Sequence, residues 1–281
     1  MPLQQKVAII GVGLLGGSLA LALKKRKGIQ LVGWNHRASS RRKAAKLLSV
    51  APTFEKAVEG ADIIVLCAHS GTITPVLKQL TKLVGPQTLI VDVSSVKGEV
   101  VQQASQIPGM NRYFVPCHPM AGKEKSGPSN ADDQLYKGRF VFITPLPNTP
   151  ASLIHRARKL WKNVGAIPIV MNPQTHDRSV ALTSHLPHLL ASALMNTYET
   201  QRHRSPSIRQ AVGSGFRDFT RISAGNPAMW ADIVEMNAVE LKSFLSSFRR
   251  SLSVLEKNLR KGRSSYWLSF FKKARASREK L

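Results

Sequence analysis

Cysteine is nearly absent from this sequence. Only Cys67 and Cys117 occur among the 281 residues, and each follows an apolar run of the kind that forms strands. A disulfide framework is therefore not indicated, and a reducing compartment is expected. The first strand-like run begins at Lys6, which leaves no room for a secretory signal peptide. We therefore expect a cytoplasmic protein.

Long apolar runs, internal repeats and low-complexity segments are also missing. No run approaches the roughly 18 consecutive apolar residues that a membrane-spanning helix needs. Hydrophobic residues nevertheless make up 43% of the sequence, which is ordinary for a packed globular protein. The length suits one large domain or two medium ones. We therefore expect neither a membrane-spanning protein nor a disordered chain.

Acidic residues are scarce. Asp and Glu total 16 against 41 Lys and Arg, so the formal net charge is +25. Such an excess favours anionic partners, although a generally basic, solvated surface explains it equally well. No motif that reads RNA or DNA accompanies the charge, so nucleic acid is not an expected partner. The basic, aromatic C-terminal end has too short an apolar face to make a membrane surface the expected partner.

Short apolar runs alternate with helical patterns over residues 1–171. Alternation of this kind is typical of βαβ units that build a mainly parallel sheet. We therefore expect an α/β, Rossmann-type dinucleotide-binding domain over this range. The expected strands cover residues 6–11, 31–35, 62–67, 88–93, 113–117, 140–144 and 167–171.

The strand signals stop after Asn172, and residues 172–281 are expected to form an all-α domain. Helical patterns cover residues 173–198, 206–212 and 227–259. The last would be about 50 Å long at about 1.5 Å per residue, with an apolar stripe that one subunit does not easily cover. A helical homodimerisation domain is the prediction, and a long helix folded back on its own neighbours is the alternative. A final amphipathic piece around Trp267 is expected to dock on this domain.

A glycine-rich segment follows the first predicted strand and precedes a helical pattern. It reads GVGLLG and matches GxGxxG. In this context the glycines permit a tight turn, close approach to a pyrophosphate and close packing of helix on strand. The pyrophosphate would meet the N-terminus of the helix, where free N–H groups favour an anion. The residues expected to bind the cofactor here are Gly11, Gly13, Leu14, Leu15 and Gly16.

The end of the second predicted strand bears on the choice of nicotinamide cofactor. A carboxylate at this point would bind the ribose hydroxyls of NAD, but the segment here contains Asn35, His36, Arg37, Ser39 and Arg41. No acid is present to repel a 2′-phosphate, and arginines pair with phosphate bidentately. These five residues are expected to bind the adenosine end, and NADP is predicted, with NAD as the alternative.

Polar side chains follow two further predicted strands. Ser94, Ser95 and Lys97 come after the run 88–93, and His118 comes directly after the run 113–117. In open α/β sheets ligands bind outside the carboxyl ends of the strands, so side chains placed there tend to be functional. A histidine in this position, with hydroxyl groups arriving from a neighbouring strand end, needs a chemical explanation.

Several motifs together resemble those of the prephenate and arogenate dehydrogenases of tyrosine biosynthesis. The motifs are GVGLLGG, DVSSVK, HPMAGKEKSG, HDRSVALTSHLPH, GFRDFTRI and NPAMW, and they cover nearly the whole chain in order. The resemblance implies oxidation of a cyclohexadienol at its ring alcohol, with hydride transfer to nicotinamide and loss of the ring carboxylate as carbon dioxide.

The resemblance also implies the catalytic residues. His118 would be the general base that accepts the proton of the ring hydroxyl, and an imidazole suits this role because its ordinary pKa lies near working pH. Ser95 would share that hydroxyl and orient His118. Read without the resemblance, His118 would be a turn residue at a strand end.

Recognition of the anionic substrate would fall to the helical domain. Arg221 matches the substrate-binding arginine of the family, and its planar guanidinium suits a carboxylate. Asp218 would orient it, although the two residues also fit an ordinary helix-surface pair. His188 would contact the substrate side chain and His185 would support the site. These two histidines lack a third ligand nearby, so no metal is expected.

Other positions carry weaker expectations. Glu124 and Lys97 match polar positions that line the substrate cleft of the family. Ser214 stands where the family often has glycine, which suggests a tighter pocket. His69 lies where the family commonly has Thr-Pro, near the nicotinamide, and is expected to bind the cofactor as a further polar contact or as a neighbour of its phosphates. Trp230 would reach the active site across the dimer interface, with a core or interface anchor as an equal alternative.

Prephenate is the predicted substrate and arogenate the alternative, because arogenate-specific relatives often lack the histidine found here at His188. A more remote alternative is a nucleotide-sensing binding protein without this turnover. Such a protein would have no need for Ser95, His118 and Arg221 together.

Overall fold

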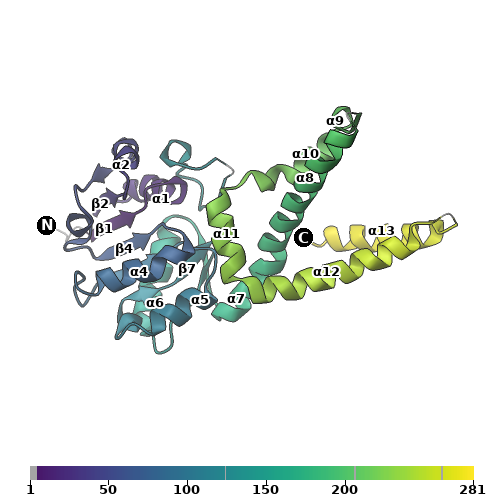
Figure 1. Cartoon of the computed structure of the whole chain (residues 1–281). Coiled ribbons are helices and arrows are strands. Elements are labelled where there is room, and N and C mark those ends of the chain that lie inside the picture. Colours follow the sequence, from purple (N-terminus) through teal and green to yellow (C-terminus); the bar gives the residue numbers. More distant parts are fainter. Residues whose placement is uncertain (1–4, 124, 206, 261) are drawn as a thin grey trace.

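The computed structural model describes residues 5–123, 125–205, 207–260 and 262–281. Its N-terminal part holds a six-stranded parallel sheet with helices on both faces, and its C-terminal part is helical (Figure 1). The strand order is β3-β2-β1-β4-β5-β6, the doubly wound order of dinucleotide-binding domains. The six strands are β1 (Gln5–Ile10), β2 (Ile29–Trp34), β3 (Ser49–Val50), β4 (Ile63–Leu66), β5 (Leu89–Asp92) and β6 (Phe114–Val115).

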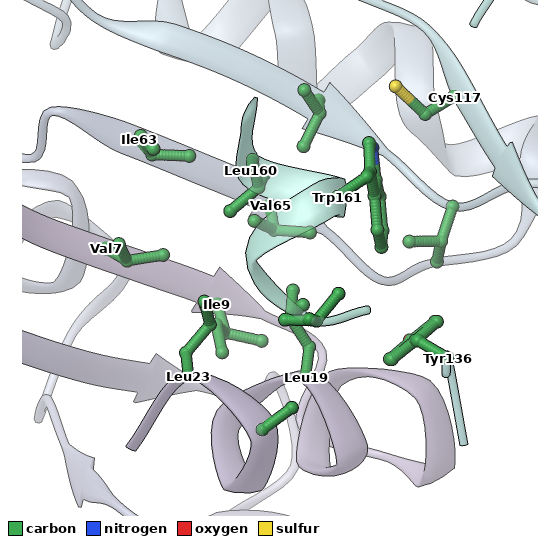
Figure 2. Packing of buried hydrophobic residues seen from close by; sticks show 14 of the residues in the cluster. Val7, Ile9, Leu19, Leu23, Ile63, Val65, Cys117, Tyr136, Leu160 and Trp161 are labelled. Atoms are coloured by element: carbon green, nitrogen blue, oxygen red, sulfur yellow. The ribbon is translucent and has the colours of Figure 1, made fainter. Parts of the chain in front are cut away.

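Five helices connect these strands and cover the two faces of the sheet (Figure 1). The central strands β1, β4 and β5 are buried on both sides, so successive residues belong to different cores. In β1, Val7 and Ile9 belong to one core and Ala8 and Ile10 to the other. Figure 2 shows the first core, where Trp161 packs with strand and helix side chains. The helices are α1 (Leu14–Lys24), α2 (Ala38–Ala44), α3 (Phe54–Val58), α4 (Ser70–Leu80) and α5 (Gly98–Ser105).

A second, three-stranded sheet corrects one prediction. The run 113–117 is not a single strand, because it divides at Pro116 between β6 and β7 (Cys117–Pro119). Strand β7 pairs antiparallel with β8 (Phe140–Ile143), and β8 pairs parallel with β9 (Ile167–Val170), which follows α6 (Ala151–Asn163). His118 therefore lies within a strand of the second sheet, opposite Phe142, and not in a turn after a strand of the first.

The helical part contains two breaks that the sequence pattern did not predict. The pattern over residues 173–198 is interrupted by a π-helical turn (Ala181–His185) just before Pro187, which has no N–H for the helical ladder. The pattern over residues 227–259 breaks at Asn237, where φ is −114° and ψ is 25°. The helices are α7 (Pro173–Val180), α8 (Leu186–Arg204), α9 (Ser207–Gln210), α10 (Ser214–Thr220), α11 (Pro227–Met236), α12 (Ala238–Asn258) and α13 (Ser264–Arg278).

Helices α8 and α12 extend away from the sheet as two arms (Figure 1). Large apolar side chains on α12 and after it are exposed, including Leu252 at 47% and Leu259 at 73%. The predicted docking of the C-terminal piece on its own chain is not supported, because no described residue of α13 is buried. The single chain thus leaves apolar surface uncovered at its helical end. Among the described residues, no helix is long and apolar enough to cross a membrane.

Candidate active site

A cavity of about 480 Å³ lies where the carboxyl ends of β1, β4 and β5 meet the helical part of the chain. Its wall combines residues from both predicted domains, so neither part forms it alone. The predicted site residues that line it are Gly11, Gly13, Leu14, Leu15, Gly16, His69, Ser95, His118, His188, Arg221 and Trp230.

The glycine-rich loop forms one end of this cavity. Gly11 has a φ of 96°, and a Cβ placed on it would lie 2.3 Å from the carbonyl oxygen of Cys67 at the end of β4. A Cβ on Gly16 would lie 2.4 Å from the carbonyl oxygen of Gly11. A Cβ on Gly13, by contrast, would meet no other atom within 4 Å. The loop is thus tightly packed at Gly11 and Gly16 and open at Gly13, at the N-terminus of α1. This arrangement accepts a pyrophosphate.

The end of β2 lies beside this loop but does not line the cavity. The side-chain oxygen of Asn35 accepts a hydrogen bond from the backbone N–H of Val12 (3.1 Å). Arg41 donates through Nη1 to the backbone carbonyls of Asn35 and His36, both at 2.9 Å. Asn35 therefore supports the glycine-rich loop, and Arg41 supports the segment that follows β2. His36, Arg37 and Ser39 are exposed.

His118 and Ser95 both line the cavity. His118 is only 8% exposed, and its Nδ1 lies 2.8 Å from Nε2 of His176. Burial lowers the pKa of His118 well below 6.5, and nearby His176, Lys97 and His185 lower it further. The expectation of a pKa near working pH is therefore corrected downward. His118 is neutral at neutral pH and has a nitrogen available to accept a proton.

Lys97 requires a correction, because it lies beneath the cavity and not in its wall. Its side chain is fully buried, and Nζ donates to Asp92 Oδ2 (2.5 Å), Ser94 Oγ (2.8 Å) and the carbonyl of Cys117 (2.8 Å). Asp92 accepts in turn from the backbone N–H of Cys117 at 2.8 Å. All three ammonium donors are thus used. The buried pair ties the end of β5 to the residue that precedes His118.

His188 and Trp230 form a stacked pair in the helical wall. Their ring centroids are 3.5 Å apart with an angle of 12° between the planes. Gly225 makes room for the pair, since a Cβ there would lie 2.4 Å from Trp230 Nε1 and 3.1 Å from His188 Cε1. Trp230 lines the cavity of its own chain, so it does not need to cross a dimer interface to reach the site.

The remaining predicted residues lie in different places. Arg221 and His69 line the cavity, and His69 precedes α4 as its N-terminal capping position. Ser214 and Asp218 are exposed on α10 and do not line the cavity. The predicted narrowing of the pocket by Ser214, and a place for Asp218 in the substrate site, are therefore not supported within this chain. Glu124 lies outside the described residues. His185 is buried behind the wall, where its Nδ1 accepts from the amide of Asn237 (3.1 Å).

Sequence reasoning missed Asp92, His176, Asp177 and Gly225. The first three are buried and act on other protein groups, so their residue types alone gave no signal. His176 and Asp177 are the first two residues of the HDRSVALTSHLPH motif, so the resemblance was the signal that could have pointed to them. In the part of the chain that the structure describes, no group of three or more His, Cys, Asp and Glu is arranged to hold a metal ion.

A doubly wound sheet, with a glycine loop and a buried histidine lining the same cavity at its edge, is typical of the class of nicotinamide-dependent dehydrogenases. Two family models match the chain. The model described as "Prephenate dehydrogenase, nucleotide-binding domain" matches residues 19–170, and the model described as "Prephenate dehydrogenase, dimerization domain" matches residues 172–273. The chain belongs to the prephenate dehydrogenase family.

Named relatives agree with this assignment. The chain is similar to a cyclohexadienyl dehydrogenase of Zymomonas mobilis, with 32% identity covering 99% of this chain and 96% of the relative. It is also similar to the prephenate dehydrogenase of Bacillus subtilis, with 29% identity over 99% of this chain and 76% of the relative. The chain is therefore an enzyme of the oxidoreductase class.

Solved structures show the same architecture. The prephenate dehydrogenase from A. aeolicus in complex with hydroxyphenyl propionate and NAD+ has a TM-score of 0.89 and 30% identity, covering 98% of each chain. The arogenate dehydrogenase of Synechocystis has a TM-score of 0.81 and 27% identity, covering 98% of this chain and 99% of the other. A nicotinamide dinucleotide is accordingly the cofactor type.

Proposed function

We propose that this enzyme catalyses the oxidative decarboxylation of prephenate to 4-hydroxyphenylpyruvate. The observation that carries the proposal is the neutral, buried His118, which lines the same cavity as Ser95, the glycine loop and Arg221. The bound cofactor would supply the hydride acceptor. The names of the relatives at 29–32% identity support the same reaction.

The proposed chemistry needs one proton acceptor. His118 takes the proton of the ring hydroxyl while the hydrogen on the same carbon leaves as hydride. The ring carboxylate then departs as carbon dioxide, and its bonding electron pair completes the aromatic ring while the ring carbonyl becomes a phenolate oxygen. The phenolate takes back a proton from His118 to give the phenol of the product. Ser95 orients the hydroxyl toward His118, and the guanidinium of Arg221 holds a carboxylate of the substrate. The stacked His188 lies on the same wall and is proposed to contact the side chain of the substrate.

We propose NADP as the preferred cofactor, with NAD as the alternative. No carboxylate occurs from residue 35 to residue 42. Arg41 donates to backbone carbonyls, so the exposed Arg37 and Arg42 are the candidate partners of a 2′-phosphate.

A rate matrix of prephenate and arogenate against NAD and NADP tests these proposals. The expected result is the highest kcat/KM for prephenate with NADP. A clear preference for NAD would overturn the cofactor proposal alone, and a clear preference for arogenate would overturn the substrate proposal alone. Absence of turnover with every pair would favour the nucleotide-sensing alternative.

The acid limb of the pH profile reports on His118. Because burial lowers its pKa, His118 stays unprotonated when the pH falls to 6.5 and gains its proton only below that value. His176 on α7, Lys97 before α5 and His185 in the π-helical turn act in the same direction. We therefore expect kcat/KM to remain near its maximum at pH 6.5 and to fall at lower pH. An acid limb centred at or above pH 6.5 would contradict this.

Replacement of His188 with Ala tests substrate choice. The change removes the ring that stacks on Trp230 and the nitrogen proposed to contact the keto acid side chain of prephenate. We expect KM for prephenate to rise by about tenfold or more, the effect of losing a hydrogen bond to a charged group, with a much smaller rise for arogenate. The arogenate rates are the internal control, and equal losses for both substrates would refute the role.

We also propose that the chain forms a homodimer through its helical domain, with the domain boundary between residues 171 and 172. The uncovered apolar side chains of α12 and α13 support this, together with the dimerization-domain match of residues 172–273. A cytoplasmic location remains a prediction from the sequence.

A further inference from the structure

A chain of two hydrogen bonds runs from His118 to a carboxylate that the sequence did not single out. His118 Nδ1 lies 2.8 Å from His176 Nε2, and His176 Nδ1 lies 2.7 Å from Asp177 Oδ1. The two imidazole rings meet edge to face, with centroids 5.0 Å apart and planes at 73°. All three side chains are buried, and His176 is completely inaccessible.

The direction of each hydrogen bond follows from the carboxylate of Asp177, the last group in this series. An ionised carboxylate has no proton to donate, so His176 must donate from Nδ1 to Asp177. A neutral imidazole that is protonated on Nδ1 carries its lone pair on Nε2, and this atom can only accept. His118 must therefore donate from its own Nδ1. Its lone pair is left on Nε2, the one ring nitrogen that His176 does not occupy.

Asp177 is itself held firmly by three groups. Its Oδ1 accepts from the backbone N–H of Lys97 at 2.8 Å, and its Oδ2 accepts from the N–H of Gly98 at 2.7 Å. Its backbone carbonyl accepts from the side-chain amide of Asn237 at 2.9 Å. Gly98 is required for this approach, because a Cβ there would lie 2.8 Å from Asp177 Oδ2. The carboxylate is thus fixed before it meets His176.

We propose that His176 and Asp177 are positioning residues that hold His118 in the single tautomer able to accept a proton at Nε2. The inference rests on the proposed role of His118 as the general base. It adds that α7, the first helix of the helical domain, sets the protonation pattern of a base carried by the other domain. When His118 gains the proton, its Nδ1–H bond becomes charge-assisted, and the positive charge faces Asp177 through one intervening ring.

Two replacements of His176 separate positioning from packing. In His176→Gln the side-chain oxygen can still accept from His118 Nδ1, whereas His176→Leu fills similar space and accepts nothing. We expect kcat to fall by roughly 10²-fold or more in the Leu variant, as when the orienting member of a catalytic triad is lost, and by about tenfold or less in the Gln variant. KM for the cofactor should be unchanged in both. Equal kcat values for the two variants would overturn the proposal.

A spectroscopic measurement on the unaltered enzyme gives the same test without turnover. Selective ¹⁵N labelling of histidine rings distinguishes a protonated from an unprotonated ring nitrogen, and the His118 signals are those missing from His118→Asn. At neutral pH we expect Nδ1 of His118 to be protonated and Nε2 not. A protonated Nε2 would overturn the inference. An active His118→Asn would instead overturn the proposed general base.

Discussion

Replacing His118 with Asn is expected to lower kcat by roughly 10²–10⁴-fold, the contribution typical of a general base. The Asn side chain is similar in size and keeps a polar atom near His176, but it has no nitrogen that can accept the hydroxyl proton. The glycine loop is separate from this residue, so KM for the cofactor should change little. Steady-state kinetics with prephenate, together with a thermal unfolding curve, checks the result.

The matched control is His155→Asn, since His155 is exposed on α6 and does not line the cavity. This variant should retain the turnover of the unaltered enzyme. Near-normal turnover of His118→Asn, with the same folding signal, would remove His118 from the mechanism.

Replacing Lys97 with Ala is expected to reduce the free energy of unfolding by about 3–5 kcal/mol, the usual effect of removing one partner of a buried ion pair. The Asp92 carboxylate would remain in the core, where neither it nor Lys97 has any exposed side-chain surface. The carbonyl of Cys117 and the hydroxyl of Ser94 would lose the same donor. Denaturant unfolding of the two proteins measures the difference.

The control is Lys25→Ala, because Lys25 also pairs with an aspartate, Asp133, but its side chain is 61% exposed. Water and salt screen that pair, so its loss should cost far less stability. If Lys97→Ala were no more destabilising than Lys25→Ala, the buried pair would not be a structural tie between β5 and β7.

Periodicity and loop chemistry were enough to predict the cofactor half of the fold. Strand β1 is a continuous apolar run because both of its faces are buried. Gly11 and Gly16 follow it because a Cβ at these positions would lie 2.3 Å and 2.4 Å, respectively, from a backbone carbonyl oxygen. Strand β3 has only two residues, too few for any pattern to show. The division at Pro116 was missed because the apolar run continues across it into a different sheet.

The site was predicted in part because motifs report residue type better than side-chain direction. Ser95 and His118 lie in the cavity wall, as strand-end residues should. Lys97, only two residues after Ser95, points into the core because Asp92 accepts its ammonium there. At the break between α11 and α12, the side-chain amide of Asn237 donates to the carbonyl of Asp177, which is sixty positions away in the chain. No local pattern contains that partner.

In the proposed homodimer, the apolar side chains left exposed on the helical arms make stability depend on protein concentration. In the proposed homodimer, part of what holds each arm in place comes from another copy, so the unfolding equilibrium contains the protein concentration. A dilute sample then melts at a lower temperature than a concentrated one without any difference in sequence. Variants of this enzyme, Lys97→Ala included, therefore have a meaningful difference in stability only at matched concentrations.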